Sequence, residues 1–310
     1  MKRSIDNNSI NSNTSKPSKK SGRGSSGTNW LQINFTNKNN NKNNHTITIA
    51  ETLIDTTQTN TTGLHVWSSA LQLAPLLIEY GQQGILHGKH IVELGCGTGV
   101  LGCVASISEF QAARIDMTDN DASVLQALHD NFQVMFPDHI QGTSDGNESN
   151  TGSKISSNGS KVHISKLEWG NFINHSDLKK FMGADIVIGA DCLYDRTQWD
   201  SFFATVYFLL SSSRDDTNTD KTDTTRNTKI NSNNNNNNTA DVAALSQRRF
   251  IGCHELRNSN HTIKPYLDKW GLVASVLQPS TQIETDCFEL SETLGLFQLV
   301  LKQKNKDEEN

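Results

Sequence analysis

Short apolar runs alternate along the chain with longer segments in which apolar residues recur at helical spacing. The short runs are rich in β-branched residues and predict five buried strands, at 90–94, 114–118, 162–167, 185–190 and 249–253. The longer segments predict helices, at 65–80, 100–108, 122–136, 198–210 and 262–270. Strands that alternate with helices are typical of an α/β fold with a doubly wound, mostly parallel sheet.

Four further segments are predicted as strands outside this alternation. Residues 272–277 and 296–301 follow one another without a helix, which predicts an antiparallel hairpin at one edge of a seven-stranded sheet. Residues 31–35 and 46–50 alternate between apolar and polar positions on either side of a block of Asn and Lys. That pattern predicts a β-hairpin with a long loop.

Low-complexity segments rich in Asn, Ser, Thr and Asp interrupt the pattern. Only 34% of the 310 residues are hydrophobic, and the deficit is concentrated in these segments. Lengthening a loop costs little stability, so we expect insertions at loop tips. The expected organisation is a disordered tail at 1–29, a single domain at 30–303 with insertions at 36–44, 141–160 and 212–246, and a polar tail at 304–310.

Charge and cysteine content narrow the class of protein. The net charge of −5 does not favour a nucleic-acid partner. The five cysteines are odd in number and lack metal-type spacing, which predicts free thiols in a reducing compartment and no metal site. No apolar run reaches the roughly 18 residues that a membrane span needs. We therefore expect a cytoplasmic or nuclear protein.

A glycine-rich turn within residues 90–102 joins a buried strand to a helix. Gly95, Gly97 and Gly99 allow positive φ and let a ligand approach the backbone closely. The helix that follows directs unpaired N–H groups over the turn. Gly97-x-Gly99-x-x-Gly102, with an acidic residue further on, matches a dinucleotide fingerprint. A tight connection without any ligand is the alternative.

Glu93 argues against a dinucleotide. A carboxylate just before the turn would repel a pyrophosphate, whereas it suits a ligand that carries an amino group. With Gly95 the spacing becomes Glu-x-Gly-x-Gly-x-Gly, which fits S-adenosylmethionine, a cation without phosphate. Asp119 follows the second strand and would accept hydrogen bonds from the ribose hydroxyls. Its alternative role is a helix cap, for which Asp121 is better placed.

Four ordered motifs resemble those of family 16 of the seven-β-strand methyltransferases, which includes protein-lysine methyltransferases. They are Val66-Trp67-Ser68-Ser69-Ala70, Glu93-Leu94-Gly95-Cys96-Gly97-Thr98-Gly99, Leu167-Glu168-Trp169-Gly170 and Asp191-Cys192-Leu193-Tyr194. The resemblance extends over about 62–302, less the insertions, and implies a Rossmann-like methyltransferase fold with S-adenosylmethionine as cofactor. Residues 207–210 and 257–270 bear a weaker similarity to a member reported as a histone-arginine methyltransferase.

The resemblance also implies residue roles. The glycine turn would shape the pocket for the methionine end of the cofactor, and Asp119 would take the ribose. Trp67 would wall the methionine or adenine side and Trp169 would lie near the adenine, although each tryptophan is alternatively a core anchor. The cofactor-binding candidates are Trp67, Glu93, Gly95, Cys96, Gly97, Thr98, Gly99, Asp119, Asn120, Trp169 and Ala190.

Asp191 and Tyr194 are the catalytic candidates and would line the channel in which the acceptor side chain meets the methyl group. Asp191 ends a buried strand at the carboxyl edge of the sheet, where ligands of α/β proteins bind. A capping carboxylate is the alternative role for Asp191. His254 also follows a strand end and could face the site, or be a satisfied polar residue elsewhere.

The acceptor nitrogen must be neutral to attack a methyl group. A lysine with pKa of about 10.4 is neutral about one time in a thousand near neutral pH, a cost of about 4 kcal/mol that desolvation reduces. Deprotonating an arginine costs more free energy and calls for two close carboxylates, a pair that Asp191 and Glu255 do not evidently form. Lysine is therefore favoured, with arginine as the alternative.

The expected partner is a protein substrate, such as a chaperone, a translation factor or a histone. Two other classes remain open: a catalytically idle adaptor that binds the cofactor, and an NAD(P) oxidoreductase. Glu93 argues against the oxidoreductase, and so does the lack of a Tyr-x-x-x-Lys proton relay.

Overall fold

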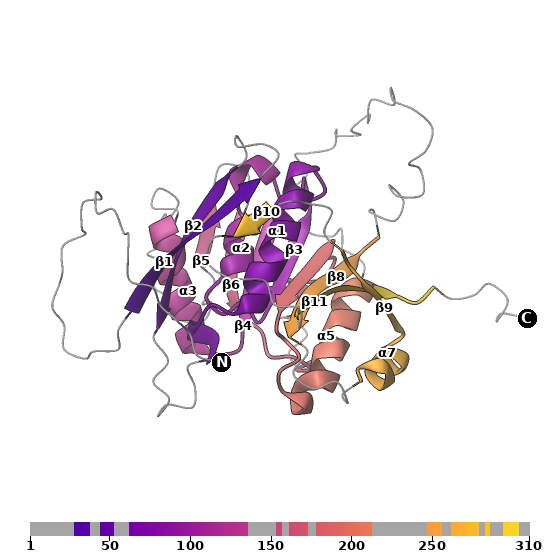
Figure 1. Ribbon diagram of the computed structural model, residues 1–310. Helices are drawn as coiled ribbons and strands as arrows, with labels where there is room; N and C mark the ends of the chain where they lie inside the picture. The colour runs from indigo at the N-terminus through magenta and orange to yellow at the C-terminus, as the bar shows by residue number, and fades with distance from the viewer. Residues whose placement is uncertain are drawn as a thin grey trace, which may run out of the picture.

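A sheet of eight strands runs through the part of the protein that the computed structural model describes (Figure 1). From edge to edge it comprises β5 (Ser153–Ser156), β6 (Lys161–Lys166), β4 (Arg114–Asp119), β3 (His90–Leu94), β7 (Ile186–Ala190), β8 (Arg249–Glu255), β11 (Leu294–Leu301) and β9 (Leu272–Val276). The strands from β6 to β8 are parallel, and β11 is antiparallel to both of its neighbours. The predicted mostly parallel sheet with an antiparallel pair at one edge is confirmed.

The number of strands differs from the predicted seven. β5 lies in a Ser-rich stretch of the segment expected to be an insertion, and it pairs antiparallel with β6. The described residues are 28–37, 44–52, 62–135, 153–156, 161–172, 178–212, 247–255, 262–278, 283–285 and 294–303. Most of the predicted tails at 1–29 and 304–310, and most of the insertions at 36–44, 141–160 and 212–246, lie outside the described residues.

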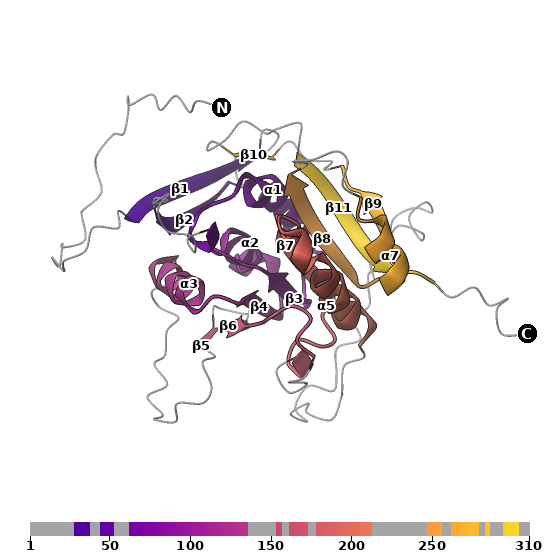
Figure 2. The same cartoon turned by 90° about the horizontal axis from the view of Figure 1, so that it is seen from below.

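Helices cover both faces of the sheet (Figure 2). α1 (Ser68–Gln82), α2 (Val100–Ala105) and α3 (Ala122–Met135) lie on one face, and α5 (Trp199–Ser211) and α7 (Lys264–Trp270) lie on the other. Short 3-10 turns precede or follow some of them: η1 (Thr62–Leu64), η2 (Ser108–Phe110) and η4 (Arg196–Gln198). The doubly wound arrangement is therefore present.

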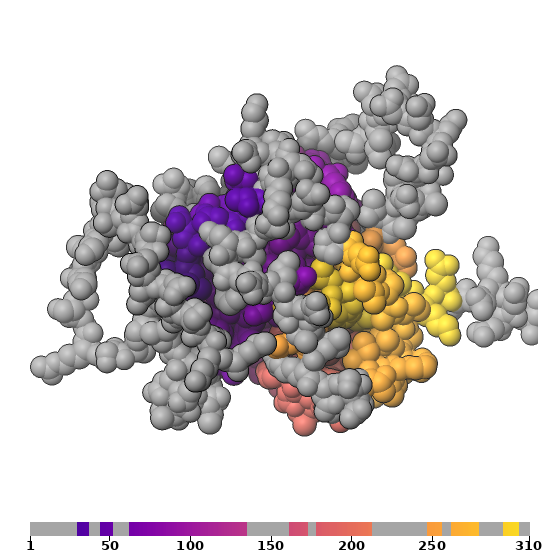
Figure 3. All heavy atoms as spheres, in the orientation of Figure 1, coloured from indigo at the N-terminus to yellow at the C-terminus, as the bar shows by residue number. Residues whose placement is uncertain are grey.

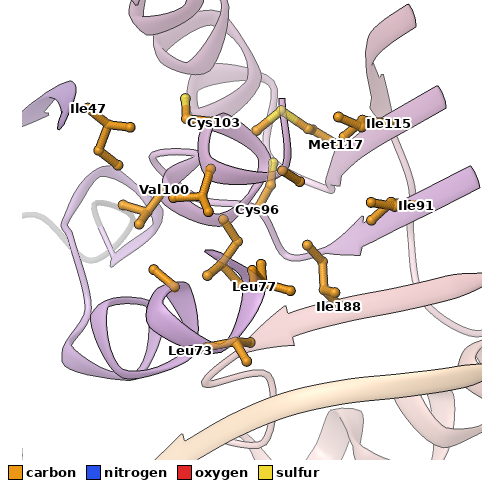
Figure 4. Packing of buried hydrophobic residues seen from close by; sticks show 14 of the residues in the cluster. Ile47, Leu73, Leu77, Ile91, Cys96, Val100, Cys103, Ile115, Met117 and Ile188 are labelled. Carbon is orange, nitrogen blue, oxygen red and sulfur yellow. The ribbon is translucent and has the colours of Figure 1, made fainter. Parts of the chain in front are cut away.

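Alternate side chains of the strands supply the two cores. Ile91, Ile115 and Ile188 pack with residues of α1 and α2 (Figure 4), while Val92 and Val187 pack with the aromatic face of α5. Because successive side chains of a strand point to opposite faces, each apolar run serves both cores. Among the described helices, no helix is long and apolar enough to cross a membrane.

A second, three-stranded sheet lies outside the helices of the first face. It pairs β1 (Thr28–Asn37) with β2 (His45–Thr52) and with β10 (Ile283–Thr285). The predicted hairpin is confirmed, and its register places Ile33 opposite Ile47 in the core. In Figure 3 the indigo residues of the N-terminal strands gather on the left of the view, and orange and yellow residues from the C-terminal part of the chain gather on the right.

The hairpin explains why α2 is apolar on every side. β2 packs against α2 and α3, so α2 lies between two sheets and all six of its residues are buried. A helix that is hydrophobic all round needs cover on all sides. The N-terminal hairpin supplies that cover for the helix that begins at the glycine turn.

Asn131 joins three of these elements at a point that is fully buried. Its Oδ1 accepts a hydrogen bond from the Ala50 amide at 2.8 Å, and its Nδ2 donates to the Ala50 carbonyl at 3.2 Å. The same Nδ2 donates to the Thr98 carbonyl at 3.1 Å. One side chain on α3 therefore ties β2 to the glycine turn.

Replacing Asn131 with Ala should lower the free energy of unfolding by about 3 kcal/mol, because buried backbone groups left without partners cost about 1–3 kcal/mol each. Urea unfolding measures the change. Gln126→Ala is the matched control on the same helix, since Gln126 is exposed and bonds only to Asp130 within the described contacts. Equal stabilities of the two variants would contradict the role assigned to Asn131.

Candidate functional site

A cavity of about 690 Å³ opens at the carboxyl ends of the parallel strands. The glycine turn after β3 contributes Gly95 and Gly97, and the end of β4 contributes residues 119–121. Residues 167–169 follow β6, and residues 190–192 lie at the end of β7. Carboxyl ends of adjacent parallel strands form the usual ligand-binding edge of an α/β sheet.

The glycine turn has little room for side chains at two positions that line this cavity. Gly95 and Gly97 have φ of 62° and 53°. A Cβ on Gly95 would lie 3.2 Å from Cζ2 of Trp169, and a Cβ on Gly97 would lie 3.2 Å from the Gly63 carbonyl oxygen. The backbone is thus bare where a ligand would approach it.

Gly99 serves the packing of the turn. It has φ of 86° as the N-cap of α2, and a Cβ there would lie 2.2 Å from Cδ1 of Leu128. It lines neither the main cavity nor the small cavity beside it. Its requirement for glycine therefore follows from its contact with α3.

Glu93 is buried, with 3% of its surface exposed. Its Oε2 has no hydrogen-bond partner among the described residues. Burial raises the pKa of Glu93 to about 8. It lines a small cavity of about 30 Å³ together with Cys96 and Thr98, and this cavity shares Gly95 and Ala190 with the main one. A buried carboxyl with one unpartnered oxygen suits a ligand that brings a cation.

The helix-capping role that the sequence left open between Asp119 and Asp121 belongs to Asp121. Asp121 Oδ1 accepts from the Ser123 amide at 2.7 Å and from Ser123 Oγ at 2.6 Å, so Asp121 caps α3. These hydrogen bonds lower the pKa of Asp121. Asp119 accepts from the amides of Asp121 and Gly97 at 3.0 and 3.2 Å and lines the cavity beside Asn120. Burial raises the pKa of Asp119.

Both candidate tryptophans line the cavity and are also anchored to the protein. Trp67 is 36% exposed, and its Nε1 donates to the Thr62 carbonyl at 2.9 Å. Trp169 makes an edge-to-face contact with Phe202, with 5.1 Å between ring centroids. Each tryptophan thus lines the cavity while another part of its side chain is held by the protein, so the two roles are compatible.

Asp191 and Tyr194 lie together at the end of β7 and both line the cavity. Asp191 is buried, and its Oδ1 lies 3.0 Å from Nδ1 of His254. Tyr194 is 61% exposed and stands at the rim. Partial burial, and then the negative charges of Asp119 and Asp195, raise the pKa of Tyr194, so the side chain is a neutral phenol at neutral pH.

All charged residues that line the main cavity are acidic. They are Asp119, Asp121, Glu168, Asp191 and Asp195, and no Lys, Arg or His is among the described lining residues. Such a surface attracts cations and repels phosphates. The charge of the cavity therefore agrees with the expectation drawn from Glu93 and disfavours a dinucleotide.

Sequence reasoning did not single out several lining residues. Glu168 lies inside a motif, and Asp195 directly follows another, so their positions carried a usable signal. Thr62, Gly63 and Gln198 lie in or beside short 3-10 turns that lack an apolar pattern. Gly63 reaches the site because its carbonyl packs on Gly97.

The four cysteines among the described residues behave as apolar residues. Cys96 and Cys103 point into the core cluster (Figure 4), and Cys192 Sγ donates to the Leu94 carbonyl at 3.2 Å. Burial raises the pKa of Cys96 and Cys192, and that of Cys253 to about 12, so these thiols are protonated and poor nucleophiles. No metal-type cluster of His, Cys, Asp or Glu occurs among the described residues.

Comparisons with known proteins agree with these features. The model of a family described as lysine methyltransferase matches residues 41–143. The protein-lysine N-methyltransferase EFM3 of Chaetomium thermophilum is 26% identical over 163 residues, 52% of this chain and 42% of that protein. Protein N-lysine methyltransferase METTL21A of Danio rerio is 29% identical over 146 residues, 47% of this chain and 55% of that protein.

A relative with another acceptor is also similar. Histone-arginine methyltransferase METTL23 of Rattus norvegicus is 24% identical over 151 residues, 49% of this chain and 55% of that protein. The chain thus spans about half the length of the curated relatives it matches.

Glu93 should make the stability of the ligand-free protein depend on pH. Its pKa is about 8 when folded against an ordinary value of 4.5, so its contribution is complete below about pH 4.5 and is lost as pH rises through about 8. Glu93→Gln should remove this loss and exceed the wild type in free energy of unfolding above about pH 8. The difference should be on the order of 5 kcal/mol at most, and small near pH 5.

Urea unfolding at both pH values checks this expectation. Glu109→Gln is the control, since the Glu109 side chain is 73% exposed. Parallel pH profiles for the wild type and Glu93→Gln would show that Glu93 ionises normally.

Proposed function

We propose that the protein, whose residues 41–143 match the model of a family described as lysine methyltransferase, transfers a methyl group from S-adenosylmethionine to a side-chain nitrogen of a protein, most readily a lysine. The observation that carries this proposal is the acidic lining of the cavity at the carboxyl ends of the strands. Cofactor and acceptor are both cations in solution, and the same negative surface attracts both.

The residues of the cavity fit the cofactor. Glu93 offers a buried, unpartnered oxygen for an ammonium group, and Gly95 and Gly97 leave the backbone bare for close approach. Asp119, with Asn120 beside it, would accept from ribose hydroxyls, and Trp169 would lie against the adenine. Cys96, Thr98 and Ala190 would complete the wall at the methionine end. When bound, S-adenosylmethionine supplies the electrophilic methyl group.

Asp191 and Tyr194 would receive the acceptor side chain. The Asp191 carboxylate would accept a hydrogen bond from the acceptor nitrogen and direct its lone pair into the cavity. Tyr194 and Trp67 would exclude water from the rim, which favours the neutral amine. The nitrogen must lose a proton before attack, and positioning can supply on the order of 7–11 kcal/mol of the remaining barrier.

The acceptor could instead be an arginine, and one observation favours that alternative. Several carboxylates surround the cavity, and a guanidinium is well bound by more than one carboxylate. A chaperone, a translation factor or a histone as the target stays a prediction, as does a cytoplasmic or nuclear location.

A transfer assay tests the proposal. Purified protein, S-adenosylmethionine with a labelled methyl group and cell extract should yield a labelled protein, and mass spectrometry should place the methyl group on lysine. Asp191→Asn should reduce the rate about 100-fold, because the acceptor loses its orientation. Asp130→Asn is the control, as Asp130 is an exposed carboxylate on α3 outside the cavity.

The other outcomes of this assay separate the alternatives. Methylation of arginine would select the alternative acceptor. Label found solely in small molecules or nucleic acid would reject a protein substrate. Tight binding of the cofactor without any transfer would identify an idle adaptor.

Asp119→Asn should weaken the binding of S-adenosylmethionine. Hydrogen bonds to a charged group contribute about 1.5–3 kcal/mol, so calorimetry should give a dissociation constant about 10-fold to 100-fold higher than that of the wild type. The rate at saturating cofactor should change much less. Unchanged affinity would remove Asp119 from the cofactor site, and Asp130→Asn again serves as control.

A further inference from the structure

Asp191 has a backbone conformation that is uncommon for a residue other than glycine. Its φ is 54°, in the left-handed region that favours glycine, and such a conformation costs an L-residue on the order of 1 kcal/mol or more. A conformation of this kind persists when surrounding contacts over-determine it. The contacts around Asp191 therefore identify what holds the carboxyl at the cavity.

The end of β8 supplies two of those contacts. β7 and β8 run parallel, with Ala190 beside Cys253 in the register. The Asp191 amide donates to the Cys253 carbonyl at 2.8 Å, and Oδ1 of Asp191 lies 3.0 Å from Nδ1 of His254. Consecutive residues of one strand thus hold both the backbone and the side chain of Asp191.

The hydrogen bond between these two side chains has a defined direction. An ionised carboxylate accepts and does not donate, so Nδ1 of His254 carries the hydrogen. A carboxylate has about four acceptor positions, and the one used by His254 leaves capacity for the acceptor nitrogen. His254 is partly buried and does not line the cavity, whereas Asp191 does. His254 therefore reaches the cavity through Asp191.

We propose that His254 is a positioning residue for methyl transfer, which fixes the Asp191 carboxylate in the orientation that receives the acceptor nitrogen. This inference rests on the proposed function. The arrangement resembles other sites in which a residue behind the first contact sets the orientation of a catalytic group. In the transfer itself the acceptor nitrogen forms a bond to the methyl carbon as the carbon–sulfur bond breaks, and its proton has left beforehand to solvent.

The variants His254→Ala and His254→Asn test the proposal in the full-length protein. His254→Ala should lower kcat about 30-fold, within the 100-fold that a misplacement of about 1 Å can cost. The dissociation constant for S-adenosylmethionine should stay within about twofold, since Asp119 and Glu93 are untouched. His254→Asn should recover most of the rate, because its Nδ2 donor is as many bonds from Cα as Nδ1 of histidine.

Two further measurements separate positioning from general damage. His129→Ala is the matched control, because His129 also lies beside an aspartate, 3.9 Å from Asp130, on α3. It should retain wild-type kinetics. In the double variant, adding His254→Ala to Asp191→Asn should cause little further loss of kcat, since residues that act as a unit are not additive.

The kinetic outcomes distinguish a positioning role of His254 from a structural role and from no role. Wild-type kcat in His254→Ala overturns the inference while leaving the proposed function intact. Loss of cofactor binding together with kcat assigns His254 a merely structural role, and failure of Asn to rescue a folded protein rejects the hydrogen bond as the cause. An absence of transfer by the wild-type protein instead overturns the proposed function itself.

Discussion

The close packing around the turn between β3 and α2 is the constraint on which the site depends. Trp169, the Gly63 carbonyl and Leu128 approach Gly95, Gly97 and Gly99 from three different parts of the chain, at distances that leave little room for a Cβ at the first two positions and none at Gly99. The turn is therefore shaped by distant elements as much as by its own sequence. Its bare backbone at Gly95 and Gly97 faces the cavity, whereas the tight contact at Gly99 locks α2 against α3.

Burial of Glu93 follows from the same packing. Gly102 on α2 lies so close that a Cβ there would come within 2.7 Å of Oε2 of Glu93, and α2 is itself covered by β2. The carboxyl is thereby enclosed, and its pKa rises to about 8. A binding site that holds a buried carboxyl with one unpartnered oxygen loses stability in the ligand-free state, which is a common property of functional sites.

Sequence predicted the parts of the fold that rest on strong local patterns. The runs that became β3, β4, β7 and β8 are continuous and apolar, and a parallel sheet buries such runs on both faces. β5 and β10 gave no comparable signal, because Ser153–Ser156 and Ile283–Thr285 are short and owe their pairing to a neighbouring strand. Tertiary contact, and not local propensity, makes these segments strands.

In the site, too, some residues could be predicted from local patterns and others depend on tertiary contacts. Residues at strand ends, such as Asp119 and Asp191, were predictable because parallel strands bring their carboxyl ends to one edge. The glycine spacing was less informative about a ligand than it first looked. Gly99 and Gly102 are glycines because a Cβ at either position would clash with Leu128, Met117 or Glu93.

The sequence could not predict which residues at the ends of different strands contact each other. His254 lies 63 residues beyond Asp191 in the chain, and only the parallel register of β7 and β8 brings them together. A parallel sheet of this kind therefore does more than collect carboxylates at one edge. It also lets a residue at the end of one strand be oriented by a residue at the end of the neighbouring strand. In this way β8, which contributes no side chain to the described lining, can still influence the chemistry of the cavity.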